Sequence, residues 1–255
     1  MTRIVSVVSG KGGAGKTTLV ANLGASLAKM GYDVVVVDAN LTTPNLGMHL
    51  GAHLFPTGFH DVLKGRATID EATYQHESGL RIIPAGIGIN DLKGADARDI
   101  PGALLDLIGK TDIILIDAAA GLGREALAAI EASDELIIIT NPDLPSVTDA
   151  LKAVKLAEEL GTKIIGVVLN RIKRKKYEMK KSDISAMLDN IPIIAEIPED
   201  ELVQEAISVR TPVVQHRPNA FVSQKIKKLA ANVVGEDIEV SKPWYQRLFN
   251  FFVQE

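Results

Sequence analysis

Cysteine is absent from this chain of 255 residues, and so are long apolar runs. Without cysteine the chain forms no disulfide, offers no thiolate to a metal or an iron–sulfur cluster, and has no cysteine nucleophile. No apolar run approaches the ~20 residues of a membrane-spanning helix. The first strand pattern begins almost at residue 1, which leaves no room for a signal peptide. These absences favour a cytoplasmic protein.

Aromatic residues are also few, at 4% of the chain, and positive charge does not dominate, because the net charge is −4. Bulk electrostatics therefore favour no polyanionic partner, although a local basic patch could still bind one. Apolar residues make up 46% of the chain, which argues against disorder. The length is enough for one large α/β domain with a sizeable core.

Apolar strand patterns alternate with helical patterns along the chain. This alternation predicts an α/β fold: a mostly parallel sheet with helices on both faces. Strands are expected at 4–8, 34–38, 80–84, 112–117, 135–140, 163–169 and 193–197. Helices are expected at 19–30, 101–108, 144–160 and 220–233, with short helices at 59–63 and 69–73.

The strongest motif lies between the first strand and the first helix, where residues 10–17 read G-x-x-x-x-G-K-T. This is the phosphate-binding loop, in its required strand–loop–helix context. Its glycines let backbone N–H groups point inward at phosphate oxygens, and the following helix adds the positive end of its dipole. Lys16 is expected on the β/γ-phosphates and the Thr17 hydroxyl on Mg²⁺. Asp117 ends an apolar strand, where a carboxylate is expected to contact a Mg²⁺-bound water opposite Thr17.

A second lysine, Lys11, stands near the start of the loop and gives K-G-G-A-G-K-T-T. This loop resembles the deviant Walker A ATPases of the MinD/ParA family, and the overall pattern is most similar to the MinD members. The resemblance covers about residues 3–235. It implies a P-loop ATPase with ATP and Mg²⁺ as cofactors, which forms a homodimer when ATP is bound. In that dimer the early lysine, here Lys11, reaches the partner's phosphates.

The resemblance also assigns the residues around the phosphates. Asp38 matches the carboxylate that supports Mg²⁺ with Thr17 and Asp117. Asn40 stands where the family commonly has an aspartate near the attacking water, so we expect slow hydrolysis, since an amide is a very poor base. Lys11, Lys16 and Asn40 are therefore the catalytic candidates.

Further family positions extend the nucleotide site. Gly121 matches a glycine whose N–H reads the γ-phosphate, although a plain strand-to-helix turn would look similar. Asn170, followed by Arg171, matches an asparagine that contacts adenine, although an amide at a strand end could equally be a turn residue. Residues 198–200 resemble the segment that closes over the base on its other side. Residues 146–149 resemble a dimer-surface segment, although Asp149 could equally be a solvated first-turn carboxylate. The expected nucleotide-binding residues are Gly10, Lys11, Gly12, Gly13, Ala14, Gly15, Lys16, Thr17, Thr18, Gly121, Asn170, Arg171, Pro198, Glu199 and Asp200.

Two other groups of residues invite functional interpretations. Residues 171–181 carry seven cations and one acid, which suits a phosphate backbone, an anionic lipid surface or simply a solvated surface. A ParA-like DNA-partitioning ATPase that binds DNA through this cluster is the alternative function. His49, His53 and His60 lack ligand-spaced partners and are interpreted as surface or packing histidines.

The C-terminal segment 243–255 differs from the rest of the chain in composition, because it is rich in aromatic residues. On a helix its apolar side chains share one arc: Trp244, Tyr245, Leu248, Phe249, Phe251, Phe252 and Val253. We interpret it as an amphipathic membrane-targeting helix, which binds weakly alone and more strongly as a pair in a dimer. Trp244, Leu248, Phe249, Phe251 and Phe252 would contact the membrane surface; docking onto the protein's own domain is the alternative.

The sequence thus predicts an ATPase domain at 1–234, a polar linker at 235–242 and a membrane helix at 243–255. The protein is expected to be cytoplasmic and, with ATP bound, peripheral to a membrane. There it would position or recruit a protein partner that the sequence does not identify. Five clustered aromatics favour a membrane partner over nucleic acid.

Overall fold

The computed structural model describes residues 1–51, 55–88, 91 and 93–236. The expected linker beyond residue 236, the segment 243–255 and His53 lie outside the described residues. Within the described residues the strands form one eight-stranded sheet with the order β3-β4-β2-β5-β1-β6-β7-β8. The pairs are parallel except for β3 with β4, which confirms the mostly parallel sheet.

The elements alternate along the chain as the pattern predicts. The strands are β1 Arg3–Val8, β2 Val34–Asp38, β3 Tyr74–Gln75, β4 Arg81–Ile83, β5 Ile113–Asp117, β6 Glu135–Thr140, β7 Lys163–Ile172 and β8 Ile193–Pro198. The helices are α1 Lys16–Lys29, α2 Leu46–His49, α3 Phe59–Leu63, α5 Ile100–Leu104, α6 Arg124–Glu131, α7 Leu144–Leu160, α8 Lys181–Met187, α9 Glu201–Ser208, α10 Val213–His216 and α11 Phe221–Val234, with 3-10 turns at η1 Ala97–Asp99 and η2 Leu105–Leu107.

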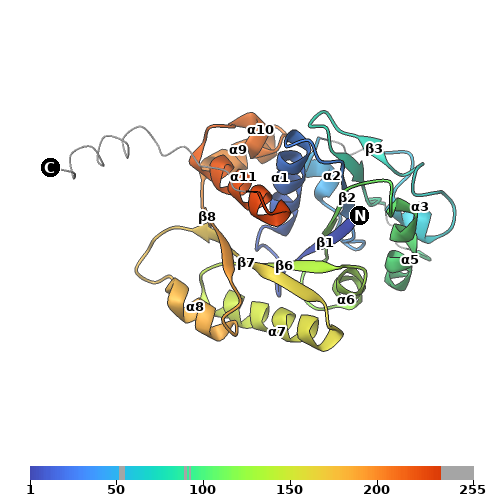
Figure 1. Ribbon diagram of the computed structural model, residues 1–255. Helices are drawn as coiled ribbons and strands as arrows, with labels where there is room; N and C mark the ends of the chain where they lie inside the picture. Colours follow the sequence, from blue (N-terminus) through green and yellow to red (C-terminus); the bar gives the residue numbers. More distant parts are fainter. Residues whose placement is uncertain (52–54, 89–90, 92, 237–255) are drawn as a thin grey trace.

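Helices cover both faces of the sheet. Figure 1 shows α1, α9, α10 and α11 on one face and α6, α7 and α8 on the other. Each face has its own apolar core, because successive strand residues point to opposite sides. Val35 and Val37 of β2 pack into one core and Val34 and Val36 into the other. The central strands are buried on both faces, which is why they read as continuous apolar runs.

Three expected elements differ from the observed ones. The helix expected at 69–73 is a turn: Thr68 and Glu71 exchange capping hydrogen bonds, but the chain enters β3 at Tyr74 before a helix can continue. The helix expected at 101–108 is α5 followed by the 3-10 turn η2. The strand expected to end at Leu169 continues to Ile172, because Ile172 pairs with Pro198 of β8.

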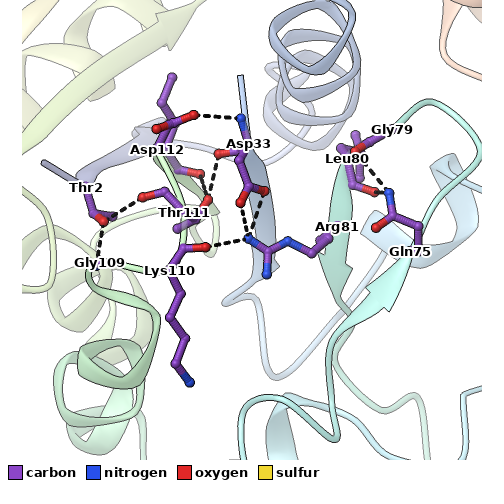
Figure 2. A network of polar contacts seen from close by, with 11 residues as sticks. Thr2, Asp33, Gln75, Gly79, Leu80, Arg81, Gly109, Lys110, Thr111 and Asp112 are labelled. Atoms are coloured by element: carbon purple, nitrogen blue, oxygen red, sulfur yellow. Dashed lines mark hydrogen bonds and ion pairs between the residues drawn. The ribbon is translucent and has the colours of Figure 1, made fainter. Parts of the chain in front are cut away.

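The amino edge of the sheet is fastened by a polar network (Figure 2). Arg81 of β4 donates through Nη2 to both Asp33 carboxylate oxygens at 2.8 Å and to the Lys110 carbonyl at 3.1 Å. Thr111 Oγ1 donates to the Asp33 carbonyl at 2.6 Å, and Thr2 Oγ1 donates to the Thr111 carbonyl at 2.6 Å. These contacts join the starts of β1, β2, β4 and β5. The loops that carry the polar motifs follow the ends of β1, β2 and β5, at the opposite, carboxyl edge.

Among the helices within the described residues, none combines the length and apolar character needed to cross a bilayer.

Candidate functional site

The phosphate loop joins β1 to α1 at the carboxyl edge of the sheet. Gly13 and Gly15 adopt left-handed φ angles of 80° and 95°, which L side chains rarely adopt. Gly10 is required for a different reason, because a Cβ there would lie 2.1 Å from the Asp149 carbonyl oxygen of α7. The loop therefore has the backbone shape that brings N–H groups to a common centre.

Lys16, the first residue of α1, lies almost buried beside two carboxylates. Burial lowers the pKa of Lys16, and the attraction of Asp117 and Asp38 opposes this shift. A desolvated ammonium group interacts more strongly with an anion than a hydrated one does, because the local dielectric is low. Lys16 is thus poised for a charged ligand at the loop.

Asp117 ends β5 and is fully buried, and burial raises its pKa to about 6. Thr17 and Lys16 lie close enough to favour its charged form. Neither carboxylate oxygen of Asp117, however, has a hydrogen-bond partner of normal geometry within the described residues. An orphaned buried carboxylate is costly, so a cation or its hydration water is the natural partner for this position.

Asp38 ends the neighbouring strand β2, in register with Asp117. It accepts hydrogen bonds from the backbone N–H groups of Asn40 at 3.2 Å, Asn45 at 3.1 Å and Leu46 at 3.0 Å. Burial, reinforced by the charge of Asp117, raises the pKa of Asp38 well above its usual value, and the three N–H groups partly offset this rise. Two buried carboxylates and the Thr17 hydroxyl are hard oxygen donors of the kind that Mg²⁺ prefers, so these residues fit the expected ion.

Asn40 is engaged within its own loop. Its Nδ2 donates to the Thr43 carbonyl at 2.6 Å, while its Oδ1 accepts from the Thr43 N–H at 3.3 Å and hydroxyl at 3.1 Å. The next residue but one, Thr42, donates through Oγ1 to Glu125 at 2.5 Å and so ties this loop to α6. The Asn40 amide is therefore a brace of the loop after β2.

The loop after β5 lies against the phosphate loop. Gly121 has a left-handed φ of 78° and donates its N–H to the Ser9 carbonyl at 3.1 Å. A glycine is needed here because the positive φ would strain any other L residue. The Gly121 N–H would have to leave Ser9 in order to bind a γ-phosphate.

Lys11 forms an ion pair inside its own chain. Its Nζ lies 3.4 Å from Asp143 Oδ1, and the two side chains are 37% and 48% exposed. Asp143 also caps α7, accepting from the Ser146 N–H at 2.9 Å and hydroxyl at 2.6 Å. An ion pair that is both long and exposed is weak, so Lys11 can exchange this partner for a stronger one.

A cleft of about 690 Å³ adjoins the phosphate loop between β7, β8, α9 and α11. Its residues include Gly15 and Thr18 of the phosphate loop and helix α1, the expected base-binding residues, and an apolar wall of Val203, Ile207, Val222 and Ile226. A cavity of this size with one apolar wall and convergent polar groups suits a nucleoside.

The expected base-binding residues lie together on this cleft. Asn170 lies within β7, rather than in a loop after it, and donates its Nδ2 to the Ala14 carbonyl at 2.8 Å. Arg171, Pro198, Glu199 and Asp200 also line the cleft, and Asp200 caps α9 by accepting from the Leu202 N–H at 3.0 Å. The structure thus brings together the sequence-predicted residues from three distant segments.

His49 lines the cleft, although the sequence predicts only a surface or packing histidine at this position. Its Nδ1 lies 3.1 Å from the Asn45 carbonyl and its Nε2 lies 3.2 Å from the Thr18 hydroxyl. Since a carbonyl only accepts, Nδ1 carries the proton and Nε2 accepts from Thr18. Burial lowers the pKa of His49, which keeps the ring neutral. His60, by contrast, is a packing residue, fully buried with Nδ1 accepting from the Gly86 N–H at 3.0 Å.

No pattern in the sequence predicts two further contacts, those of Lys11 with Asp143 and of Thr42 with Glu125. Each joins residues more than 80 positions apart. Asp149 lies in the second turn of α7, where its side chain pairs with Lys152 at 2.9 Å, so it is not a first-turn carboxylate.

Comparison with known proteins agrees with this geometry. Residues 5–213 match the family model described as the CobQ/CobB/MinD/ParA nucleotide binding domain. An uncharacterized ATP-binding protein of Methanocaldococcus jannaschii is 37% identical over 239 residues, which are 94% of this chain and 90% of that protein.

Two solved structures are similar over nearly the whole chain. The septum site-determining protein MinD of Pyrococcus horikoshii, complexed with Mg-ADP, is 38% identical with a TM-score of 0.88, covering 91% of this chain and 96% of that one. The MinC:MinD cell division complex of Aquifex aeolicus contains a chain that is 30% identical with a TM-score of 0.84, covering 94% of this chain and 99% of that one.

The fold and the phosphate loop define a P-loop nucleotide-binding protein. The chain belongs to the CobQ/CobB/MinD/ParA family, and within it resembles the MinD ATPases.

Proposed function

We propose that this protein is a MinD-type ATPase that binds ATP with Mg²⁺, dimerises around the nucleotide and hydrolyses it to ADP. The observation that carries the proposal is the junction of β1, β2 and β5. There Lys16, Asp38 and Asp117 are buried together beside the phosphate loop, and Asp117 has no normal hydrogen-bond partner within the described residues.

In this proposal the phosphate loop binds the phosphates through its N–H groups, and Lys16 neutralises charge on the β/γ-phosphates. Thr17 would bind Mg²⁺ directly, with Asp38 and Asp117 supporting it, and the ion would supply charge neutralisation for phosphoryl transfer. Asn170 and Arg171 would hold the base in the cleft, with residues 198–200 on its other side. Gly121 and Asn40 would act after release from Ser9 and Thr43.

Lys11 would act across the dimer. Two nucleotides that face each other repel, and a lysine from each chain offsets that repulsion. In the described chain Lys11 has the weak cis partner Asp143, so exchange for a partner's phosphates costs little.

Replacing Lys11 by alanine should therefore leave nucleotide binding to the monomer largely intact and abolish the ATP-dependent dimer. Light scattering with ATP and Mg²⁺ measures the dimer, and titration with a fluorescent nucleotide measures binding. Lys110→Ala is the matched control, because Lys110 is also an exposed lysine paired with an aspartate, Asp70, but lies at the opposite, amino edge of the sheet. A K11A protein that still dimerises would refute the role.

The second part of the proposal places the protein on a membrane. It divides the chain into an ATPase domain at 1–234, a linker at 235–242 and an amphipathic helix at 243–255 whose paired copies bind lipid when ATP joins two chains. A peripheral, ATP-dependent position of this kind would let the protein place or recruit a protein partner.

Phe252→Asp should reduce ATP-dependent co-sedimentation with anionic vesicles by about 10²-fold, the gain expected from pairing two weak anchors. Dimerisation should be unchanged, which separates lipid contact from assembly. Equal vesicle binding by the parent and by a chain ending at Lys242 would rule out the membrane helix.

A further inference from the structure

The loop that joins β7 to α8, residues 173–180, is here named the basic loop. It projects from the body of the protein beside the edge strand β8 (Figure 1). The loop backbone is held in a defined conformation, because the Glu178 carboxylate accepts hydrogen bonds from the Lys173 N–H at 2.8 Å and the Lys175 N–H at 3.1 Å. The Met179 N–H also donates to the Pro142 carbonyl at 3.0 Å, which fixes the loop to the start of α7.

This geometry engages Glu178, the single acidic residue of the basic loop, with backbone N–H groups. Glu178 turns its oxygens toward the loop's own backbone, so among the described residues it forms no ion pair with the lysines around it. Lys173 pairs with Glu199 at 2.9 Å, and Lys181, the first residue of α8, pairs with Glu196 at 2.6 Å. These two pairs fasten the base of the loop to β8 and to the residue that follows it, and they leave the positive charges at the tip of the loop without a paired carboxylate.

Four exposed cations therefore have no carboxylate within ion-pair distance in the part of the chain that the structure describes. They are Arg174, Lys175, Lys176 and Lys180. Next to three of them stands Tyr177, whose side chain is 77% exposed. A large ring kept in water beside unpaired cations is a feature that folding alone does not explain, because the ring buries little and the cations repel one another.

We propose that the tip of the basic loop, residues 174–177, is a second contact with an anionic lipid surface. Lysine and arginine gain from the negative potential of such a surface, and a tyrosine ring suits the headgroup level of a bilayer. The alternative partner, nucleic acid, fits less well for two reasons. The chain carries a net charge of −4, so the molecule as a whole does not attract a polyanion. The single tyrosine ring could stack only on unpaired bases, and a duplex has no unpaired bases.

This inference deepens the proposed membrane function, but it rests on residues different from those of segment 243–255. The basic loop lies at the carboxyl edge of the sheet beside the cleft, since Lys173 lines both the cleft and the hollow next to Tyr177. Contact with lipid at this loop would place the nucleotide edge of the protein near the membrane.

The test uses the full chain with ATP and Mg²⁺ in 0.1 M NaCl, sedimented with vesicles of equal parts phosphatidylglycerol and phosphatidylcholine. The variant is R174Q/K175Q/K176Q. Its matched control, K29Q/K93Q/K228Q, removes three exposed lysines elsewhere that also lack an ion-pair partner in the described residues. We expect the loop variant to partition about 100-fold less onto these vesicles, since each cation near an anionic surface contributes about five-fold. The control should bind like the parent.

Further arms identify the partner. Tyr177→Ser should weaken vesicle binding by a factor that persists in 0.5 M NaCl, because the ring contributes without charge. Pure phosphatidylcholine vesicles should not distinguish the loop variant from the parent. Light scattering should show the same ATP-dependent dimer for all variants.

A loop variant that binds anionic vesicles like the parent, or that loses no more than the control, overturns the inference. So does a loop variant that keeps vesicle binding but loses affinity for a labelled 30-nucleotide single strand, since the surface then belongs to nucleic acid. The membrane helix of the proposed function is tested separately. It is refuted if Phe252→Asp leaves vesicle binding unchanged while the loop variant lowers vesicle binding.

Discussion

Asn40 illustrates how much one residue can decide at this site. It stands two positions after Asp38, and we propose that this position faces the attacking water. A carboxylate there would orient and deprotonate the water, whereas an amide can orient it but hardly deprotonate it. Its side chain also braces the loop through Thr43, with the Nδ2 donor 2.6 Å from the carbonyl oxygen. A carboxylate in its place would face that carbonyl oxygen with no proton to share.

Asn40→Asp should therefore both release the loop and supply a base. We expect single-turnover ATP hydrolysis to rise by about 10²-fold, the low end of the contribution of a positioned base, about 10²–10⁴-fold. Rapid quench with labelled ATP measures the step. Asn45→Asp is the control, since Asn45 also donates to the Thr43 carbonyl but stands seven positions after Asp38, outside the position of the family's aspartate. If N40D hydrolyses ATP no faster than the parent, then Asn40 does not stand in for the aspartate.

At the scale of elements, α2 is a four-residue helix that is held at both ends. Its N-terminus donates two N–H groups to Asp38, and His49 at its other end accepts from Thr18 in the first turn of α1. A helix this short has little stability of its own. The two anchors thus connect the loop that carries Asn40 to the helix that follows the phosphate loop.

His49→Ala should loosen this connection. Each lost hydrogen bond is worth about 1 kcal/mol, so nucleotide affinity should fall roughly 5- to 10-fold, with a larger fall in turnover if the loop loses its position. Fluorescent-nucleotide titration together with kcat and KM separates the two effects. His216→Ala, which removes a hydrogen-bonded imidazole from α10 away from the cleft, should behave like the parent. Unchanged affinity and turnover in H49A would show that α2 needs no such anchor.

At the scale of the whole molecule, Glu135 at the amino end of β6 joins three strands and, through Arg3, the last described helix. It accepts from Lys163 of β7 at 2.6 Å and from Arg3 of β1 at 3.1 Å, and Arg3 also donates to the Val233 carbonyl at 2.8 Å. Burial opposes ionisation of Glu135, but the hydrogen bonds from Lys163 and Arg3 outweigh it and hold the pKa of Glu135 below its usual value. A carboxyl group whose pKa is lowered on folding contributes stability above its unfolded pKa and loses it as the pH falls through the folded pKa.

Glu135→Gln should lower the unfolding temperature at pH 7 by about 2–6 °C, which corresponds to about 1–2 kcal/mol for charged hydrogen bonds at a partly exposed site. The difference from the parent should shrink as the pH falls below the ordinary glutamate pKa of about 4.3 and then through the lower folded pKa, where the native carboxyl group also becomes protonated. Thermal unfolding followed by circular dichroism at several pH values measures both effects. Glu158→Gln, which breaks an exposed pair with Lys155, is the control and should change little. A constant difference from pH 7 to pH 3 would contradict the ionic origin.

The sequence by itself determined the central strands, the phosphate loop and the positions of Asp38 and Asp117. These follow from local rules: apolar runs must be buried, the left-handed turns need Gly13 and Gly15, and parallel strands deliver their terminal residues to one edge. Element lengths were less secure. Residues 69–73 carry helix-start chemistry, yet pairing of Tyr74 with β4 wins over continuation of one helical turn.

Only the tertiary structure decided which distant groups meet. The Lys11–Asp143 pair, the His49–Thr18 contact and the orphaned carboxylate of Asp117 depend on how helices and loops pack over the sheet. The basic loop shows the same limit, since the sequence counts its cations but the fold decides that Glu178 braces the backbone and that Lys173 is paired. Such contacts depend on side-chain positions set by packing across many elements, and no local periodicity encodes them.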